Sequence, residues 1–124
     1  MKVIIAGAGS VGRSIAKELV QSGHDITIID RHPSAMKVAS VPEAEWQLDD
    51  ACELTSLQRA NLDEADVVVA TTGDDKVNLV VSLLAKTEFG VERVIARVNN
   101  PKNEWLFDES WGVDVAVSTP RVIA

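Results

Sequence analysis

Gly7-Ala8-Gly9-Ser10-Val11-Gly12 is a glycine-rich stretch with the spacing G-x-G-x-x-G. A β-branched run over residues 2–6 precedes it, and apolar residues at helical spacing follow it from Ser10 to about Ser22. In such a strand–loop–helix unit the first glycine allows the tight turn, the second lets backbone approach a pyrophosphate, and the third permits close packing of helix on strand. The stretch therefore predicts a phosphate-binding loop at a helix N-terminus.

One acidic residue follows this loop at a distance that fits the same unit. Asp30 lies at the end of the second β-branched run, 18 residues after Gly12. Its carboxylate is placed to accept hydrogen bonds from both hydroxyls of an adenosine ribose and would repel a 2′-phosphate, so NAD(H) is favoured over NADP. Arg31 is the competing signal, because an arginine beside the site can bind a 2′-phosphate. Since adenosine recognition needs no nicotinamide, ATP, ADP and AMP fit the same residues.

Further β-branched runs alternate with helical stretches along the chain. The runs predict six strands: Lys2 to Ala6, Asp25 to Ile29, Glu45 to Leu48, Asp66 to Ala70, Arg93 to Val98 and Val113 to Val117. Runs such as Val67-Val68-Val69 do not alternate apolar with polar residues, which is typical of parallel strands covered on both faces. The predicted fold class is α/β: a Rossmann-like doubly wound parallel sheet of six strands, with five helical crossovers and helices on both faces.

Composition limits the classes of partner and compartment. The 124 residues are 46% apolar and carry 19 acidic against 12 basic side chains, a net charge of −7, so the basic surface that nucleic-acid binding needs is missing. No apolar stretch approaches the roughly 18 residues that span a bilayer, and no cleavable signal peptide is evident, so we expect no direct membrane insertion. The lone Cys52 has no partner for an internal disulfide, which favours a cytoplasmic location.

Three more segments are expected at the same edge of the sheet, because ligands of doubly wound sheets lie beyond the carboxyl ends of the strands. After the third strand, a carboxylate or backbone group of the stretch Asp49 to Cys52 could meet an adenine edge; the alternative is a helix N-cap by Asp49 or Asp50. Arg97, near the end of the fifth strand, is interpreted as a phosphate ligand. The segment after the fourth strand, small and hydroxylated enough to pass close to ribose or phosphate, consists of Thr71, Thr72, Gly73 and Asp74, of which the last two could equally cap the next helix.

The sequence predicts binding without catalysis. His24 and His32 have no nucleophile or orienting carboxylate at a recognisable spacing, Cys52 has no second cysteine for redox or zinc chemistry, and the chain has no tyrosine. We therefore predict no catalytic residue and no metal site. The alternatives are the cofactor domain of an NAD-dependent dehydrogenase, which would need a substrate domain with a catalytic base, and a methyltransferase that uses the same glycine loop for S-adenosylmethionine.

The motifs together resemble a known family. The glycine loop, Asp30, the stretch Ala70 to Asp75 followed by Asn78-Leu79, and the stretch Val94 to Pro101 are similar to the N-terminal RCK (KTN) domain of TrkA-type potassium-uptake regulators, over essentially the whole chain. The resemblance implies a cytoplasmic regulatory subunit of a Trk- or Ktr-like system, docked at the inner face of the cell membrane on a potassium transporter or channel subunit that it gates. It also implies a homo-oligomer, either a dimer or a ring of dimers.

The resemblance also assigns roles to single residues. The glycine loop would hold the phosphates of NAD(H) or an adenine nucleotide, Asp30 the ribose, Asp50 and Ala51 the adenine, Thr72 and Gly73 the ribose-phosphate stretch, and Arg97 a phosphate. The family often has glycine where this chain has Asp49.

The same resemblance makes residues 1–124 the N-terminal nucleotide-binding domain of a two-domain regulator. Family members usually continue into a crossover helix and a second ligand-binding domain, and this chain contains neither. The tail Val122-Ile123-Ala124 resembles the start of another helix. We therefore expect either one domain of a longer protein or a single-domain member of the family.

Overall fold

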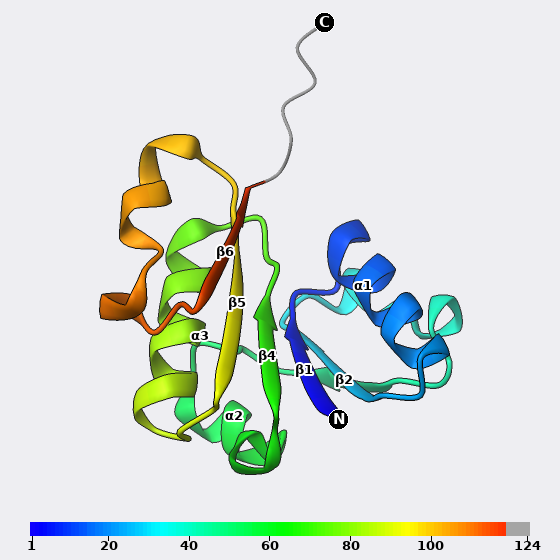
Figure 1. The fold of residues 1–124 in the computed structure, drawn as a ribbon. Coiled ribbons are helices and arrows are strands. Elements are labelled where there is room, and N and C mark those ends of the chain that lie inside the picture. Colours follow the sequence, from blue (N-terminus) through cyan, green and yellow to red (C-terminus); the bar gives the residue numbers. More distant parts are fainter. Residues whose placement is uncertain (119–124) are drawn as a thin grey trace, which may run out of the picture.

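Six parallel strands form one sheet in the order β3-β2-β1-β4-β5-β6 (Figure 1). The computed structural model describes residues 1–118, so the tail 122–124, predicted to start another helix, lies outside the described residues. The predicted fold class is confirmed; β1, β3 and β5 have the predicted bounds, and the other three strands differ from them by one or two residues. The strands are β1 (Lys2–Ala6), β2 (Asp25–Asp30), β3 (Glu45–Leu48), β4 (Val67–Ala70), β5 (Arg93–Val98) and β6 (Val115–Ser118).

Three of the five crossovers contain an α-helix, and the prediction of helices in all five is wrong for the other two. The helices are α1 (Ser10–Gln21) between β1 and β2, α2 (Leu54–Arg59) before the 3-10 turn η3 (Leu62–Glu64), and α3 (Asp75–Thr87) between β4 and β5. The remaining crossovers contain only 3-10 turns: η1 (Pro33–Ala35) and η2 (Val38–Ser40) before β3, and η4 (Pro101–Leu106) and η5 (Glu109–Trp111) before β6. Proline explains part of this, because Pro33 and Pro101 open turns, and Pro42, which cannot donate an N–H, lies two residues after Ser40, the last residue of η2.

Apolar side chains fill both faces of the sheet. Adjacent residues of a strand point to opposite faces, so the continuous runs of β1 and β4 supply two layers. On one face Ile5 and Ile28 pack with Ala16 of α1. On the other face Ile4 and Val68 belong to a second layer that includes Leu57 of α2 and Val81 of α3. Figure 1 shows α1 on one side of the sheet and α2 and α3 on the other.

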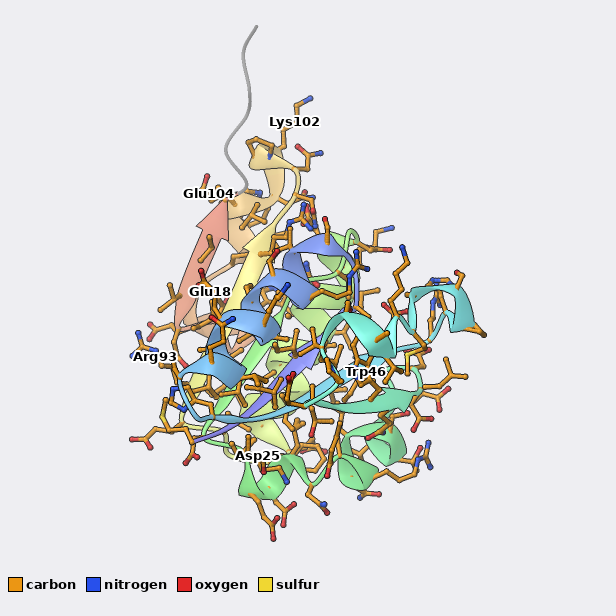
Figure 2. All side chains as sticks on the ribbon, turned by 90° about the vertical axis from the view of Figure 1, so that its right-hand side faces the viewer. Glu18, Asp25, Trp46, Arg93, Lys102 and Glu104 are labelled. Atoms are coloured by element: carbon orange, nitrogen blue, oxygen red, sulfur yellow. The ribbon has the colours of Figure 1, made fainter. Side chains whose placement is uncertain are left out.

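Charged side chains are distributed over the outside of this fold. Glu18, Asp25, Arg93, Lys102 and Glu104, labelled in Figure 2, are all exposed. Trp46 of β3 differs, since it is half-buried and its indole N–H donates to the carbonyl oxygen of Val41 at 3.0 Å, which fastens the η2 connection to the sheet (Figure 2). None of the helices within residues 1–118 is long and apolar enough to cross a membrane.

The strand order places a crevice at one edge of the sheet. The chain leaves β1 through α1 on one face, and leaves β4, the neighbour of β1, through α3 on the other. Where adjacent parallel strands send their connections to opposite faces, the loops at their carboxyl ends separate. The glycine loop and the loop after β4 lie at this point.

Candidate functional site

A cavity of about 710 Å³ lies at the carboxyl ends of β1, β2, β3, β4 and β5. Eleven of the fourteen residues predicted for the site line it, from six separate segments of sequence. They are Gly7, Gly9, Ser10, Asp30, Arg31, Asp50, Ala51, Thr71, Thr72, Gly73 and Arg97. The structure therefore brings together residues up to 90 positions apart, as expected for the carboxyl edge of a parallel sheet.

Ala8, Val11 and Gly12 were also predicted for the site and lie outside the lining of this cavity. Ala8 is fully buried, and its backbone N–H donates to Asp30 while its carbonyl oxygen accepts from Arg13 at 2.8 Å. Val11 lines a smaller apolar groove on the α1 face of the sheet. These three residues therefore support the glycine loop without lining the cavity.

The three glycines of the loop meet different steric demands. Gly7 has φ +115°, and a Cβ there would lie 2.9 Å from the backbone nitrogen of Thr72. A Cβ on Gly12 would lie 2.0 Å from the carbonyl oxygen of Gly7, so α1 can pack this closely on the loop only because residue 12 has no side chain. A Cβ on Gly9 would meet no atom of the described residues within 4 Å, which leaves the outer side of the loop open.

The N-terminus of α1 opens on this space. Gly9 is its N-cap, no side chain within residues 1–118 caps it, and its first turn contains no acidic residue. Unsatisfied N–H groups and the helix dipole give such an end a partial positive charge. The loop is therefore suited to a phosphate group.

Asp30 is held in place by backbone N–H groups. Its Oδ2 accepts from the N–H of Ala8 at 2.9 Å, and its Oδ1 accepts from the N–H of His32 at 2.8 Å. The first bond ties the end of β2 to the glycine loop, which is also joined by the N–H of Gly7 donating to the carbonyl oxygen of Ile29 at 2.8 Å. Each carboxylate oxygen keeps capacity for a further donor, so Asp30 can accept a pair of hydroxyl groups.

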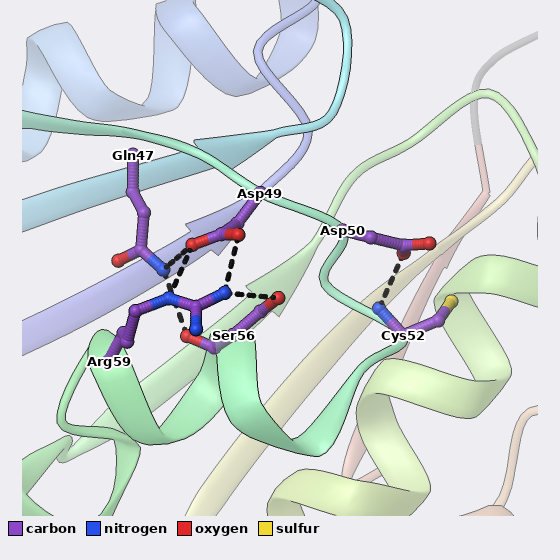
Figure 3. Close-up of polar contacts among 6 residues, drawn as sticks. All are labelled: Gln47, Asp49, Asp50, Cys52, Ser56 and Arg59. Atoms are coloured by element: carbon purple, nitrogen blue, oxygen red, sulfur yellow. Dashed lines mark hydrogen bonds and ion pairs between the residues drawn. The ribbon is translucent and has the colours of Figure 1, made fainter.

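Asp50, Ala51 and Cys52, in the loop after β3, line the cavity. Figure 3 shows Asp50 and Cys52 of this loop. Oδ1 of Asp50 accepts from the N–H of Cys52 at 2.9 Å, which closes a tight turn. The predicted alternative of a helix N-cap by Asp49 or Asp50 is wrong, because this turn delays α2 until Leu54 and puts Glu53 at the N-cap. Burial raises the pKa of the Cys52 thiol, and the neighbouring Asp50 carboxylate acts in the same direction.

Asp49 makes a bidentate ion pair with Arg59 of α2 (Figure 3). Nε of Arg59 lies 3.0 Å from Oδ2 and a terminal nitrogen lies 2.6 Å from Oδ1. Gln47 donates to the same carboxylate at 2.8 Å. The Arg59 hydrogen bonds, followed by that from Gln47, hold the pKa of Asp49 below its ordinary value, so the carboxylate stays charged at neutral pH.

The loop after β4 forms the wall that faces the glycine loop. Thr71 is buried, and its Oγ1 donates toward the carbonyl oxygens of Ala6 and Gly7, at 3.2 and 3.3 Å. Thr72 donates its hydroxyl to Oδ1 of Asn78 at 2.6 Å. Asp74 caps α3 by accepting from the N–H of Lys76 at 2.9 Å, as one of the sequence alternatives predicted.

A buried polar network behind this wall was not anticipated from the sequence. Asp75 accepts from the N–H groups of Asn99 and Asn100, at 2.7 and 2.9 Å, and from the side chain of Asn103 at 2.9 Å. Asn78, fully buried, donates to the carbonyl oxygens of Thr72 and Arg97, both at 3.0 Å. Burial raises the pKa of Asp75, but the hydrogen bonds from Asn103, Asn99 and Asn100 together outweigh burial and lower it.

Asp49, Cys52 and Asp74 also line the cavity, and they lie in the segments that the sequence places at this edge of the sheet. The apolar lining residues carry no chemical signal in the sequence. In all, seven lining residues fall outside the fourteen predicted for the site. They are Ile29, His32, Ala35, Asp49, Cys52, Asp74 and Val77. No group of three or more His, Cys, Asp and Glu within residues 1–118 is arranged to hold a metal ion.

The sequence of this chain matches a known domain family and a curated relative. The profile of the TrkA-N domain family matches residues 3–119. The Trk system potassium uptake protein TrkA of Mycobacterium tuberculosis (strain H37Rv) is 66% identical over 124 residues, which are all of this chain and 56% of the relative. The chain thus spans little more than half the length of that curated relative.

Solved structures of an NAD-bound and an ADP-bound protein are also similar to this chain. The GsuK channel bound to NAD is 28% identical with a TM-score of 0.79, over 94% of this chain and 20% of that one. GsuK bound to ADP has the same identity, TM-score and coverage of this chain, and 30% of that structure is covered. Given the match over residues 3–119, the chain belongs to the TrkA-N domain family.

Proposed function

We propose that this chain is the nucleotide-binding domain of a regulatory subunit of a Trk-type potassium uptake system. A single cavity combines an open glycine loop at a helix N-terminus with a carboxylate fixed by backbone N–H groups, and this combination carries the proposal. Membership of the TrkA-N family and the 66% identity to a potassium uptake protein supply the physiological setting. Residues 1–124 act as the sensing domain of a longer regulator.

The residues divide the ligand among them. Backbone at Gly9 and Ser10, at the N-terminus of α1, holds the phosphates, and Asp30 accepts the hydroxyls of the adenosine ribose. Asp50 and Ala51 contact the adenine. Thr72 and Gly73 approach the ribose-phosphate stretch from the opposite wall, and Arg97 supplies a cation for a phosphate.

NAD(H) is the preferred ligand, with ATP, ADP and AMP as the other candidates. GsuK, 28% identical, has been seen with NAD and with ADP. The carboxylate of Asp30 disfavours a 2′-phosphate, and the exposed Arg31 lies with its Nε 3.4 Å from Nε2 of His32. NADP therefore binds more weakly than NAD.

The domain acts by binding and not by turnover. It docks, at the cytoplasmic face of the cell membrane, on a potassium transporter or channel subunit, and its ligand shifts that assembly between two states for which the ligand has different affinities. It does so as a homo-oligomer. Two features support self-association: Val80 and Leu83 of α3 are only partly buried, and Trp105 is 75% exposed.

Calorimetric titration with NAD, NADH, NADP, ADP and ATP at fixed salt tests this proposal. We expect one site per chain, with NAD or NADH bound most tightly and recovered unchanged. Asp30→Ala should weaken binding by about 1.5–3 kcal/mol, or roughly 10- to 150-fold, because a charged acceptor is lost. Asp25→Ala is the matched control, since Asp25 is an exposed carboxylate at the opposite end of β2. Equal affinity of both variants would remove Asp30 from the site, and no binding of any nucleotide would refute the proposal.

A further inference from the structure

Two adjacent carboxylates in the loop after β3 point in opposite directions. Figure 3 shows the Asp50 side chain directed at Cys52 and the Asp49 side chain directed at Gln47 and Arg59. Both residues line the cavity, whereas Arg59 does not. Arg59 therefore contacts the cavity lining through Asp49.

The contacts around Asp49 fix its position. Arg59 donates to both carboxylate oxygens, at 2.6 and 3.0 Å, and Gln47 donates to Oδ2 at 2.8 Å and to the carbonyl oxygen of Ser56 at 2.9 Å. Arg59 itself is the last residue of α2, and Leu57 in the same helix is fully buried in the core. A bidentate pair with a rigid base and a third donor has a defined geometry, unlike most surface ion pairs.

Charge gives this arrangement a consequence for a bound anion. The carboxylates and guanidinium groups in the cavity lining come from Asp30, Arg31, Asp49, Asp50, Asp74 and Arg97. Carboxylates thus outnumber guanidinium groups by four to two around a site proposed for phosphorylated ligands. Without Arg59, the Asp49 carboxylate would keep the hydrogen bond from Gln47 but lose the bidentate partner and the positive charge that compensates its own, so it would repel a bound anion more strongly.

We propose that Arg59 is a positioning residue for nucleotide binding: it holds the Asp49 carboxylate away from the ligand and fixes the loop that contacts the adenine. The inference rests on the proposed function. It concerns a feature of this chain, because the glycine often found at position 49 in the resembling family offers no carboxylate to hold.

Titration of three variants with NAD and with ADP tests the inference. Arg59→Gln should lower the affinity for both by about three- to tenfold at low salt, and less at 1 M salt, where charge is screened. The double variant Asp49→Asn with Arg59→Gln should recover at least half of that loss, because the carboxylate that needs compensation is gone. Arg93→Gln is the control for net charge, since Arg93 is exposed at the other end of β5, and it should bind like the unaltered chain. Thermal unfolding establishes that each variant is folded.

The outcomes separate this inference from the proposed function. If the unaltered chain binds NAD or ADP and Arg59→Gln binds equally well, the inference is refuted alone. If the double variant binds no better than Arg59→Gln, Arg59 only stabilises α2, and the inference is refuted as well. If the unaltered chain binds neither nucleotide, the proposed function fails and this inference fails with it.

Discussion

Substitution of Gly12 by alanine should destabilise the fold by an amount that the structure lets us work out. The new Cβ would lie 2.0 Å from the Gly7 carbonyl oxygen and 2.9 Å from Oγ1 of Thr71. The Gly7 oxygen belongs to backbone that is pinned by its own N–H bond to Ile29, so it cannot swing away as a flexible side chain would. We expect a cost at or above the upper end of the overpacking range, about 3 kcal/mol. With an unfolding entropy of about 2.1 cal/mol/K per residue over 124 residues, this lowers Tm by roughly 10 °C.

Gly9→Ala is the matched comparison in the same loop. The φ of Gly9 is −70°, and its Cβ would meet no atom of the described residues within 4 Å, so stability should change by less than about 1 kcal/mol. The methyl group would, however, occupy the space proposed for the phosphates, so NAD should no longer raise Tm. Differential scanning calorimetry with and without NAD measures both effects. An unchanged Tm for Gly12→Ala, or an equal loss for Gly9→Ala, would refute this assignment of packing to one glycine and ligand approach to the other.

Three further predictions concern Asp75 and Cys52. Asp75→Ala leaves the N–H groups of Asn99 and Asn100 without their acceptor and should cost about 2–3 kcal/mol in urea unfolding; an effect below 1 kcal/mol would contradict the network. Hydrogen bonds hold the pKa of Asp75 below its ordinary value of 3.8, so the stability that Asp75 contributes to the fold is present above that pH and lost as the pH falls further. The unaltered chain should therefore lose stability on acidification more steeply than Asp75→Ala. Parallel plots of unfolding free energy against pH for the two proteins, from urea unfolding between pH 6 and 3, would contradict this. Burial raises the pKa of the Cys52 thiol, so iodoacetamide should react slowly at pH 8 and more slowly with NAD present; acceleration by NAD would contradict the position of Cys52 in the cavity.

Local patterns predicted the fold and most of the residues that the structure brings together around one cavity. The apolar β-branched runs specify strands without knowledge of their neighbours, and parallel order follows from the helical stretches between them. Gly7, Gly9, Gly12 and Asp30 were predicted for the site from a fixed spacing within one strand–loop–helix–strand unit. These signals survive in sequence because each depends on residues close together in the chain.

Contacts made only by the tertiary fold were missed. Asp75 and Asn99 are 24 positions apart and meet because β5 lies beside β4. No sequence spacing therefore predicts their hydrogen bond. The ion pair of Asp49 with Arg59 depends on the turn that delays α2, and the sequence read the same aspartate as an adenine contact or a helix cap. Apolar lining residues such as Val77 were missed because the sequence does not distinguish an apolar residue that is buried in a core from one that lines a cavity.

Titration of the 15N-labelled chain with NAD, followed residue by residue in NMR spectra, tests directly whether the nucleotide binds at the carboxyl ends of the strands. We predict that the amide signals of Gly7, Gly9, Asp30 and Thr72 shift together with one dissociation constant. The signal of Arg93, at the opposite end of the strands, should stay in place. Shifts centred on the amino ends of the strands, or none at NAD concentrations in the millimolar range, would contradict it.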